Sequence, residues 1–162
     1  FMVESEQIRE TLQQCIQAQV DEMQKPEYPQ GYSDKGATKS DSIGECSEIF
    51  IVQLKLFYND STKNSTIVKF KENELYQICG NIYELVSVIV HIGNTMKSGH
   101  YICYCKYGKE WFTYNDTVVK RGINNPSRTG TPYMFFFRRV SAALTAQKKA
   151  NVRIIQTIKV IF

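Results

Sequence analysis

The sequence predicts an α+β fold in which one amphipathic helix precedes a mainly antiparallel β-sheet. Near the N-terminus apolar residues recur at every fourth position, which is typical of a helix with one buried face. From residue 48 onward, apolar and aromatic runs alternate with short polar segments, which is typical of strands joined by turns. With 162 residues, of which 43% are hydrophobic and 12% aromatic, the chain can build one packed core.

The predicted helix spans Ser5–Met23. Within it Ile8, Leu12, Ile16 and Val20 follow one another at a four-residue step, with Cys15 beside them and Glu, Gln and Arg elsewhere. Side chains at this spacing share one side of a helix. We therefore expect the helix to pack against the core through this stripe.

Residues 25–47 carry two prolines and three glycines and show no periodic pattern. This composition predicts an irregular connection. A connection of this length is uncommon inside a compact domain, and it indicates either a functional segment or a lost insertion.

Six later segments have the apolar or alternating pattern of β-strands and lie close together along the chain. Strands at such short spacing favour antiparallel neighbours. The segments are Ile49–Tyr58, Thr66–Phe70, Tyr83–His91, His100–Lys106, Trp111–Tyr114 and Tyr133–Val140. We expect residues 1–140 to form one domain and residues 141–162 to be a basic and apolar tail.

Composition argues against several classes of partner and location. The net charge is only +4 and the basic residues are scattered, so a nucleic-acid partner is not expected. No apolar run approaches the ~18 residues that cross a bilayer, so a membrane is not expected either. Five cysteines without a paired C-x-x-C spacing suit a reducing compartment, the cytoplasm or the nucleus. The chain begins with Phe1, which we interpret as the start of a piece of a longer protein.

A histidine opens the strand SGHYICYC and is the strongest candidate for chemistry. If Tyr107 and Gly108 form a two-residue turn, counting outward places His100 opposite Asn115, with Asp116 one step beyond. Opposed side chains on one sheet face are close enough for a hydrogen bond. If the loop is one residue longer, Asp116 takes the place of Asn115. An imidazole held in this way has a fixed tautomer, as a general base requires.

Two other interpretations of this segment are open, an inert sheet and a metal site. A histidine and an asparagine on adjacent strands also occur in inert sheets. A metal site is suggested by the proximity of His91, His100, Cys103 and Cys105 in the sequence. Side chains alternate along a strand, however, so the two cysteines point to one face and His100 to the other. We therefore predict no metal and no cofactor.

Five segments follow one another along the chain in this order: EIFIVQLKLF, YELVSVIVHIGN, SGHYICYCK, EWFTYNDTVV and YMFFFRRV. Together they resemble the second half of the catalytic domain of the ubiquitin-specific proteases, which are papain-like cysteine deubiquitinases. The resemblance is strongest over residues 37–140. It implies a papain-like fold, a hydrolase or thiol-protease activity in protein deubiquitination, and ubiquitin or a ubiquitinated protein as the partner.

The resemblance also implies roles for single residues. His100 corresponds to the catalytic histidine of the family, Asn115 to the third member of its triad, and Asp116 to a further acidic residue near the site. The loop from Asn94 to Gly99 is similar to a loop that closes over the tail of ubiquitin, and residues 59–65 are similar to a second gating loop. We expect four residues of this region to contact the substrate: Asn94, Ser98, Gly99 and Tyr101.

The chain departs from the family in two respects. The family nucleophile lies in a block that reads approximately G-N-T-C, and no such block is present; Met96 follows the GNT of residues 93–95. The two C-x-x-C pairs of the family's zinc-binding fingers are also missing, because residues 25–47 contain only Cys46. We therefore expect no structural zinc and a reduced grip on the body of ubiquitin.

Two hypotheses follow for the function. In the first, the chain is the C-terminal part of a thiol-dependent deubiquitinase whose nucleophile lies elsewhere, so the chain alone is inactive. In the alternative, it is a non-catalytic ubiquitin-binding remnant, a pseudoenzyme. An unrelated α+β module is the third and weakest interpretation.

Overall fold

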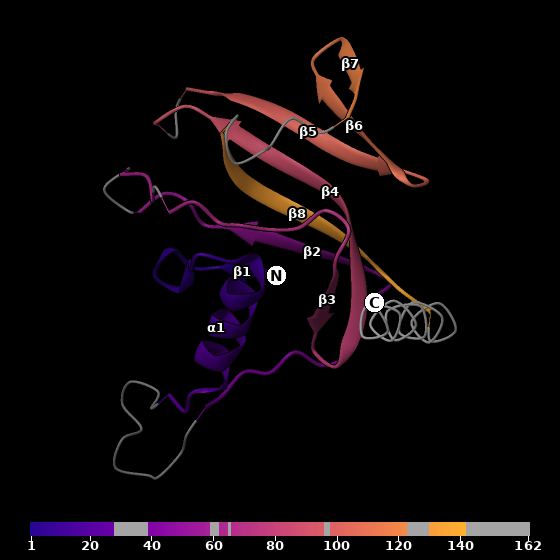
Figure 1. Cartoon of the computed structure of the whole chain (residues 1–162). Helices are drawn as coiled ribbons and strands as arrows, with labels where there is room; N and C mark the ends of the chain where they lie inside the picture. Colours follow the sequence, from indigo (N-terminus) through magenta and orange to yellow (C-terminus); the bar gives the residue numbers. More distant parts are fainter. Residues whose placement is uncertain (28–38, 59–61, 65, 96–97, 123–129, 142–162) are drawn as a thin grey trace, which may run out of the picture.

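The structure, a computed structural model, describes residues 1–27, 39–58, 62–64, 66–95, 98–122 and 130–141. Among these residues one eight-stranded sheet carries a single α-helix on one side, which confirms the α+β class (Figure 1). The helix α1 spans Leu12–Gln24. The strands are β1 (Met2–Val3), β2 (Ile49–Leu54), β3 (Leu75–Ile78), β4 (Asn81–Ile92), β5 (His100–Tyr107), β6 (Glu110–Asn115), β7 (Val118–Arg121) and β8 (Thr131–Arg139).

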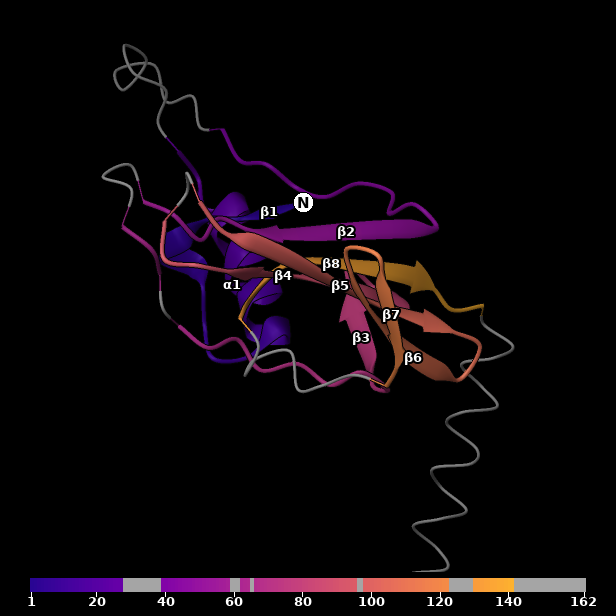
Figure 2. The same cartoon turned by 90° about the horizontal axis from the view of Figure 1, so that it is seen from above.

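The strand order is β1-β2-β8-β4-β5-β6-β7, with β3 paired to the outer part of β4. All pairs are antiparallel except β1 with β2. The long strand β4 is therefore the centre of the sheet, and β5 to β7 continue from it as two successive hairpins (Figure 2). The predicted mainly antiparallel sheet is confirmed.

The helix begins later than the sequence pattern predicted. Residues Ser5–Gln7 form a short 3₁₀ turn, and α1 starts after Thr11, whose hydroxyl accepts a hydrogen bond from the backbone N–H of Gln14. The Gln14 side chain in turn accepts one from the Thr11 backbone N–H, and the two bonds form a capping box. A cap at this position sets the start of the helix at Leu12, so Ile8, which belongs to the predicted helix, lies outside α1.

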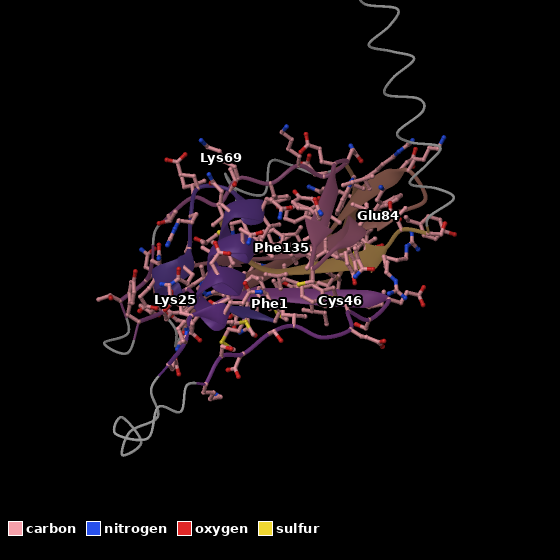
Figure 3. The ribbon with its side chains drawn as sticks, turned by 90° about the horizontal axis from the view of Figure 1, so that it is seen from below. Phe1, Lys25, Cys46, Lys69, Glu84 and Phe135 are labelled. Carbon is pink, nitrogen blue, oxygen red and sulfur yellow. The ribbon has the colours of Figure 1, made fainter. Side chains whose placement is uncertain are left out.

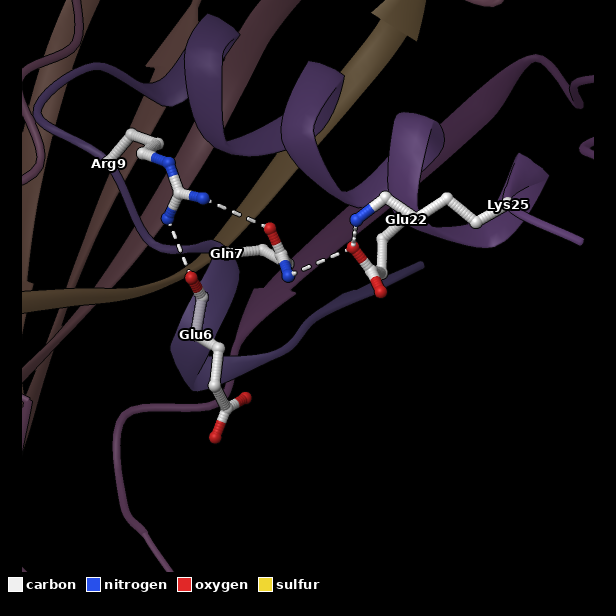
Figure 4. A network of polar contacts seen from close by, with 5 residues as sticks. All are labelled: Glu6, Gln7, Arg9, Glu22 and Lys25. Atoms are coloured by element: carbon white, nitrogen blue, oxygen red, sulfur yellow. Dashed lines mark hydrogen bonds and ion pairs between the residues drawn. The ribbon is translucent and has the colours of Figure 1, made fainter. Parts of the chain in front are cut away.

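Polar contacts join the short turn to the helix. Arg9 donates to the Glu6 carbonyl at 2.6 Å and to the Gln7 side chain at 3.1 Å, and Gln7 contacts Glu22 at 3.5 Å. Lys25, at the C-terminal cap, completes the set through Glu22 at 2.5 Å (Figure 4). These exposed contacts hold the segment before α1 against the helix rather than continuing it.

The strand predictions were right in position for five of six segments. The sixth, Thr66–Phe70, is not a strand: Lys69 forms an isolated bridge with Thr11, and Val68 is fully buried. Its alternating pattern therefore reports packing beside the start of α1 and not a place in the sheet. Three short strands were missed, β1, β3 and β7, because two to four residues carry too little periodicity.

One face of the sheet forms the core together with α1. The core includes Phe50, Val52, Phe135 and Phe137 from the sheet, and the buried helix residues Leu12, Cys15 and Ile16 join the same cluster. Phe135 lies beside the helix in Figure 3. The buried helix positions Leu12, Cys15, Ile16 and Gln19 follow the i, i+3, i+4, i+7 spacing of one helix face.

The opposite face of the sheet, here called the outer face, remains partly exposed. The strand registers align its residues in rows across β2, β8, β4, β5 and β6. Ile49 and Ile51 are 48% and 39% exposed, and Tyr114 is 40% exposed. Five further residues belong to this face: Ile89, Cys103, Cys105, Phe112 and Phe136.

Four sequence predictions fall wholly or partly outside the described residues. These are the irregular connection over residues 25–47, of which residues 28–38 are not described, the gating loop over residues 59–65, the loop over residues 94–99, of which residues 96–97 are not described, and the tail over residues 141–162. The division into residues 1–140 and 141–162 stays a prediction.

Candidate active site

The His100 and Asn115 side chains meet at the edge of the sheet where β5 begins and β6 ends. The Nε2 atom of His100 lies 2.5 Å from Oδ1 of Asn115, which confirms the predicted contact. Because an amide oxygen only accepts, the geometry assigns the proton to Nε2 of the imidazole. The Asn115 amide therefore fixes both the tautomer and the direction of the ring.

The register that brings them together differs from the predicted one. The turn consists of Gly108 and Lys109, since Tyr107 pairs with Glu110, and Gly108 has a φ of +62°. A glycine with positive φ at the first central position is typical of a type II′ turn. The chain forms this turn in place of the predicted Tyr107-Gly108 turn. Continuing this register places Asn115 opposite residue 102, so His100 reaches Asn115 diagonally.

Asp116 lies next to the pair but is not its main partner. It occupies the two-residue turn between β6 and β7 with a φ of +50°, a conformation that aspartate tolerates better than most residues. Its Oδ2 atom is 3.9 Å from Nε2 of His100, and the side chain is 77% exposed. Asp116 is therefore a more distant neighbour of the imidazole, while Asn115 makes the hydrogen bond.

The second imidazole nitrogen of His100, Nδ1, is the atom that could exchange a proton. Within the described part of the chain, Nδ1 of His100 has no hydrogen-bonding partner. The ring is half-exposed, with 43% of its side-chain surface accessible. An imidazole oriented through one nitrogen and open at the other can take a proton from a thiol and return it to a leaving group.

The structure describes all four residues that are expected to contact the substrate. Asn94 and Ser98 are exposed, and the Ser98 hydroxyl is 2.8 Å from that of Thr95. Tyr101 is 52% exposed and alternates with His100 along β5, so the two side chains leave opposite faces of the strand. Gly99 has no room for a side chain: a Cβ there would overlap the ring of His91 and lie 2.8 Å from the carbonyl oxygen of Ile92.

Sequence reasoning missed the role of two residues beside this site. His91 is buried to 2% exposure, and Lys63 lies over its ring nitrogen at 3.4 Å. The sequence offered His91 only as a possible metal ligand. A usable signal existed, because His91 directly follows the apolar stretch Val88–Val90 of β4 and buried histidines need a partner.

None of the five cysteines is arranged as a nucleophile for His100. Cys103 and Cys105 share the outer face, with their sulfur atoms 3.4 Å apart, which confirms their predicted common face. Burial raises the pKa of Cys103 to about 11, and the neighbouring Cys105 adds to the effect. Burial also raises the pKa of Cys15 and of Cys79. A nucleophilic cysteine needs the opposite shift.

Among the residues that the structure describes, no three histidine, cysteine, aspartate or glutamate side chains come together as a metal site.

The comparisons with known proteins identify a family for the chain. The family model described as ubiquitin carboxyl-terminal hydrolase matches residues 4–137. The chain belongs to the ubiquitin carboxyl-terminal hydrolase family. The match includes α1 and the strands from β2 up to residue 137 of β8, and it contains nearly all of residues 37–140, where the predicted resemblance to ubiquitin-specific proteases is strongest.

Curated relatives carry the same family name. Human ubiquitin carboxyl-terminal hydrolase 29 is 28% identical over 156 residues, which cover 82% of this chain and 17% of the relative. Zebrafish (Danio rerio) ubiquitin carboxyl-terminal hydrolase 13 is 42% identical over 60 residues, 37% of this chain and 7% of the relative. The chain thus spans less than a fifth of the length of these relatives.

Solved structures support the fold. A yeast SAGA DUB module structure matches with a TM-score of 0.62 at 24% identity, covering 86% of this chain and 33% of the other. A SAGA DUB module with Ubp8, Sgf11, Sus1 and Sgf73, bound to monoubiquitin, matches with a TM-score of 0.63 at 22% identity, covering 86% and 35%. The predicted papain-like α+β fold is confirmed by these neighbours. Separately, none of the described helices is long and apolar enough to cross a membrane.

Proposed function

We propose that this chain is the histidine-bearing part of the catalytic domain of a thiol-dependent deubiquitinase. The observation that carries the proposal is the pair of His100 and Asn115, with Nε2 bonded to the amide and Nδ1 without a partner among the described residues. The family membership supports hydrolysis after the C-terminal glycine of ubiquitin as the reaction. Ubiquitin or a ubiquitinated protein is the proposed partner, and the cytoplasm or the nucleus is the proposed location.

In this proposal a cysteine outside this chain supplies the nucleophile. The His100 imidazole takes the thiol proton at Nδ1, and the thiolate sulfur attacks the carbonyl carbon of the ubiquitin glycine. As the carbon–nitrogen bond breaks, the imidazolium returns its proton to the leaving lysine amine. Water then hydrolyses the thioester, again with His100 as the base. Asn115 keeps the ring in one orientation throughout, and Asp116 places a carboxylate 3.9 Å from Nε2.

The proposal also assigns four residues of this chain to substrate binding. Gly99 and Tyr101 line the channel for the ubiquitin tail, and Asn94 and Ser98 belong to the loop beside it. The blocked Cβ position of Gly99 supports a narrow passage, because the backbone there already touches the ring of His91.

A ubiquitin probe with a C-terminal electrophile tests the proposal. The chain alone is expected to remain unlabelled, because its cysteines are not activated. A longer protein that joins this chain to a family-type cysteine segment is expected to be labelled and to release a fluorophore from a ubiquitin amide. His100→Ala should lower that release by ~10²- to 10⁴-fold, the range of general acid–base catalysis.

Matched variants sharpen the interpretation. Asn115→Ala should lower turnover and Asn115→Asp should retain it, while Lys109→Ala in the exposed turn should leave it unchanged. Labelling of any of the five cysteines in the chain alone would contradict the assignment. Binding of ubiquitin by the longer protein without turnover would favour the non-catalytic alternative.

A further inference from the structure

His91 is a buried histidine that the proposed chemistry does not use. It lies near the end of β4 with 2% of its surface exposed, and it is one of three buried polar side chains in the described part of the chain. A buried imidazole is costly unless its nitrogens are satisfied and its charge is avoided. Its surroundings therefore have to explain why it is there.

Two aromatic rings and one lysine enclose the His91 ring. The Phe57 ring is 5.7 Å away edge-on, and the Tyr101 ring is 4.9 Å away between centroids. The Lys63 ammonium is 3.4 Å from Nδ1 and donates a 2.6 Å hydrogen bond to the Gly93 carbonyl. An ammonium group only donates, so Nδ1 is the acceptor and the ring proton resides on Nε2.

The charges around His91 favour the neutral ring. Burial, followed by the positive charge of Lys63, lowers the pKa of His91 below its ordinary value of 6.5. Burial likewise lowers the pKa of Lys63. Two other rings face His91, the Tyr101 phenol ring from β5 and the Phe57 ring, and Thr131 pairs with His91 from β8. Among the described residues no carboxylate pairs with His91.

The ring of His91 also supports the backbone that carries His100. In the register of β4 with β5, His91 pairs with Tyr101 and Ile92 pairs with His100, so the two histidines leave opposite faces of the sheet. The Nε2 edge of His91 occupies the space where a Cβ of Gly99 would stand. Gly99 thus lies directly against His91 and is bonded to His100.

We propose that His91 is a positioning residue: its neutral ring, enclosed by Phe57, Tyr101 and Lys63, supports Gly99 and so sets the orientation in which His100 meets Asn115. The inference rests on the role proposed above for His100. It also ties the Lys63 segment to the site, because Lys63 binds both the His91 ring and the Gly93 carbonyl.

Histidine-selective ¹⁵N labelling tests this inference directly, because the chain has only two histidines. In the wild-type chain we expect one imidazole, His91, to carry its proton on Nε2 and to titrate below 6.5. We expect His100 to be a separate signal with a predominant Nε2-protonated tautomer. His91→Ala identifies the signals by removing one of them.

The decisive reading is the tautomer ratio of His100. In His91→Ala we expect this ratio to move toward the mixture seen for free histidine, because Gly99 loses its support. His91→Phe fills the space of the ring and is expected to keep the ratio near that of the wild type. Lys63→Met removes the nearby charge and is expected to raise the titration midpoint of His91 toward 6.5.

Tyr83→Phe is the matched control for lost stability. Tyr83 is a fully buried residue of the same strand, and its hydroxyl donates a 2.8 Å hydrogen bond to the Ser47 carbonyl. It should lower the unfolding midpoint without changing the tautomer ratio of His100. An unchanged ratio in His91→Ala, or a wild-type His91 that titrates at 6.5 or is protonated on Nδ1, would overturn the inference. Hydrolysis that survives His100→Ala in the longer protein would instead overturn the proposed function alone.

Discussion

A hydrogen atom is the only side chain that fits at residue 99. The ring of His91 fills one side of Gly99, and the carbonyl oxygen of Ile92 lies within 2.8 Å of the place where a Cβ would stand. The backbone that leads into His100 is thus in close contact with the end of β4 on one side, although Gly99 itself is exposed. This packing explains why a site at the end of a strand can hold a half-exposed imidazole in one direction.

Gly99→Ala should destabilise the chain by about 1–3 kcal/mol, because the added methyl group overpacks a region where backbone and ring atoms cannot both retreat. Urea unfolding followed by circular dichroism measures the loss. Gly44→Ala is the control, since nothing lies within 4 Å of a Cβ there, and it should stay within about 0.5 kcal/mol of the wild type. Equal effects of the two substitutions would show that the close packing at Gly99 is wrong.

The candidate pair itself was partly predictable from the sequence. His100 and Asn115 were assigned from their types and their separation, and the contact exists. The register was wrong because two adjacent turns, Tyr107-Gly108 and Gly108-Lys109, are both acceptable locally. His91 and Lys63 could not be joined by pattern, because 28 residues separate them and only the fold brings them together.

At the scale of the elements, the caps and the cross-strand ion pairs determine boundaries that hydrophobic periodicity leaves open. Ile8 continues the apolar stripe of the helix, yet the helix starts four residues later because Thr11 and Gln14 form a capping box. Periodicity reports which residues are buried, and it does not distinguish a helix from a segment that packs beside one.

Thr11→Ala tests the cap. We expect a loss of about 1 kcal/mol in the free energy of unfolding, since the backbone N–H of Gln14 loses its acceptor. Gln17→Ala, which removes only an exposed contact with Asp21 on the same helix, should change stability by less than about 0.5 kcal/mol. A cap variant as stable as this control would argue against the observed helix start.

Glu84 joins three strands in the middle of the sheet. From β4 it binds Lys106 of β5 at 3.3 Å and Arg138 of β8 at 2.8 Å, with 14% of its side chain exposed. Burial alone would raise the pKa of Glu84, but the hydrogen bonds from Arg138 and Lys106 outweigh burial and lower it below the ordinary 4.5. The charged carboxylate therefore stabilises the folded state.

This depressed pKa has a defined pH dependence. The contribution of Glu84 is fully present above pH 4.5 and is lost as the pH falls through the lower folded-state value. Glu84→Gln should cost about 2 kcal/mol at neutral pH, the scale of hydrogen bonds to a charged group, and the difference from wild type should shrink in acid. Unfolding curves at several pH values measure it, with the exposed Glu45→Gln as control. A difference that is constant with pH would contradict the charge assignment.

For the whole molecule, the main feature is the contrast between the two faces of the sheet. One face is closed by α1 and forms the core, while the outer face leaves Ile49, Ile51 and Tyr114 between 39% and 48% exposed. Contiguous exposed apolar surface of this kind favours association. The fold class was predictable because alternation marks these strands clearly, but the sequence did not show which face the helix would cover.

Ile51→Lys should therefore reduce self-association of the chain in sedimentation velocity experiments while leaving the unfolding midpoint nearly unchanged. The adjacent residue supplies the control: Val52 is fully buried on the core face, and Val52→Lys should prevent folding. If both substitutions unfold the chain, the outer face is part of the core and the assignment of the two faces fails.

The tight turn at Gly108 and Lys109 has a consequence beyond its own stability. The length of this turn determines which side chains of β6 share a face with His100 at the start of β5. Every added residue moves the side chains that follow it to the other face of the sheet. A single insertion there would withdraw the amide of Asn115 from the imidazole even though the turn lies at the far end of the hairpin. The exposed tip is thus a poor place for tags or insertions, despite the usual tolerance of surface loops.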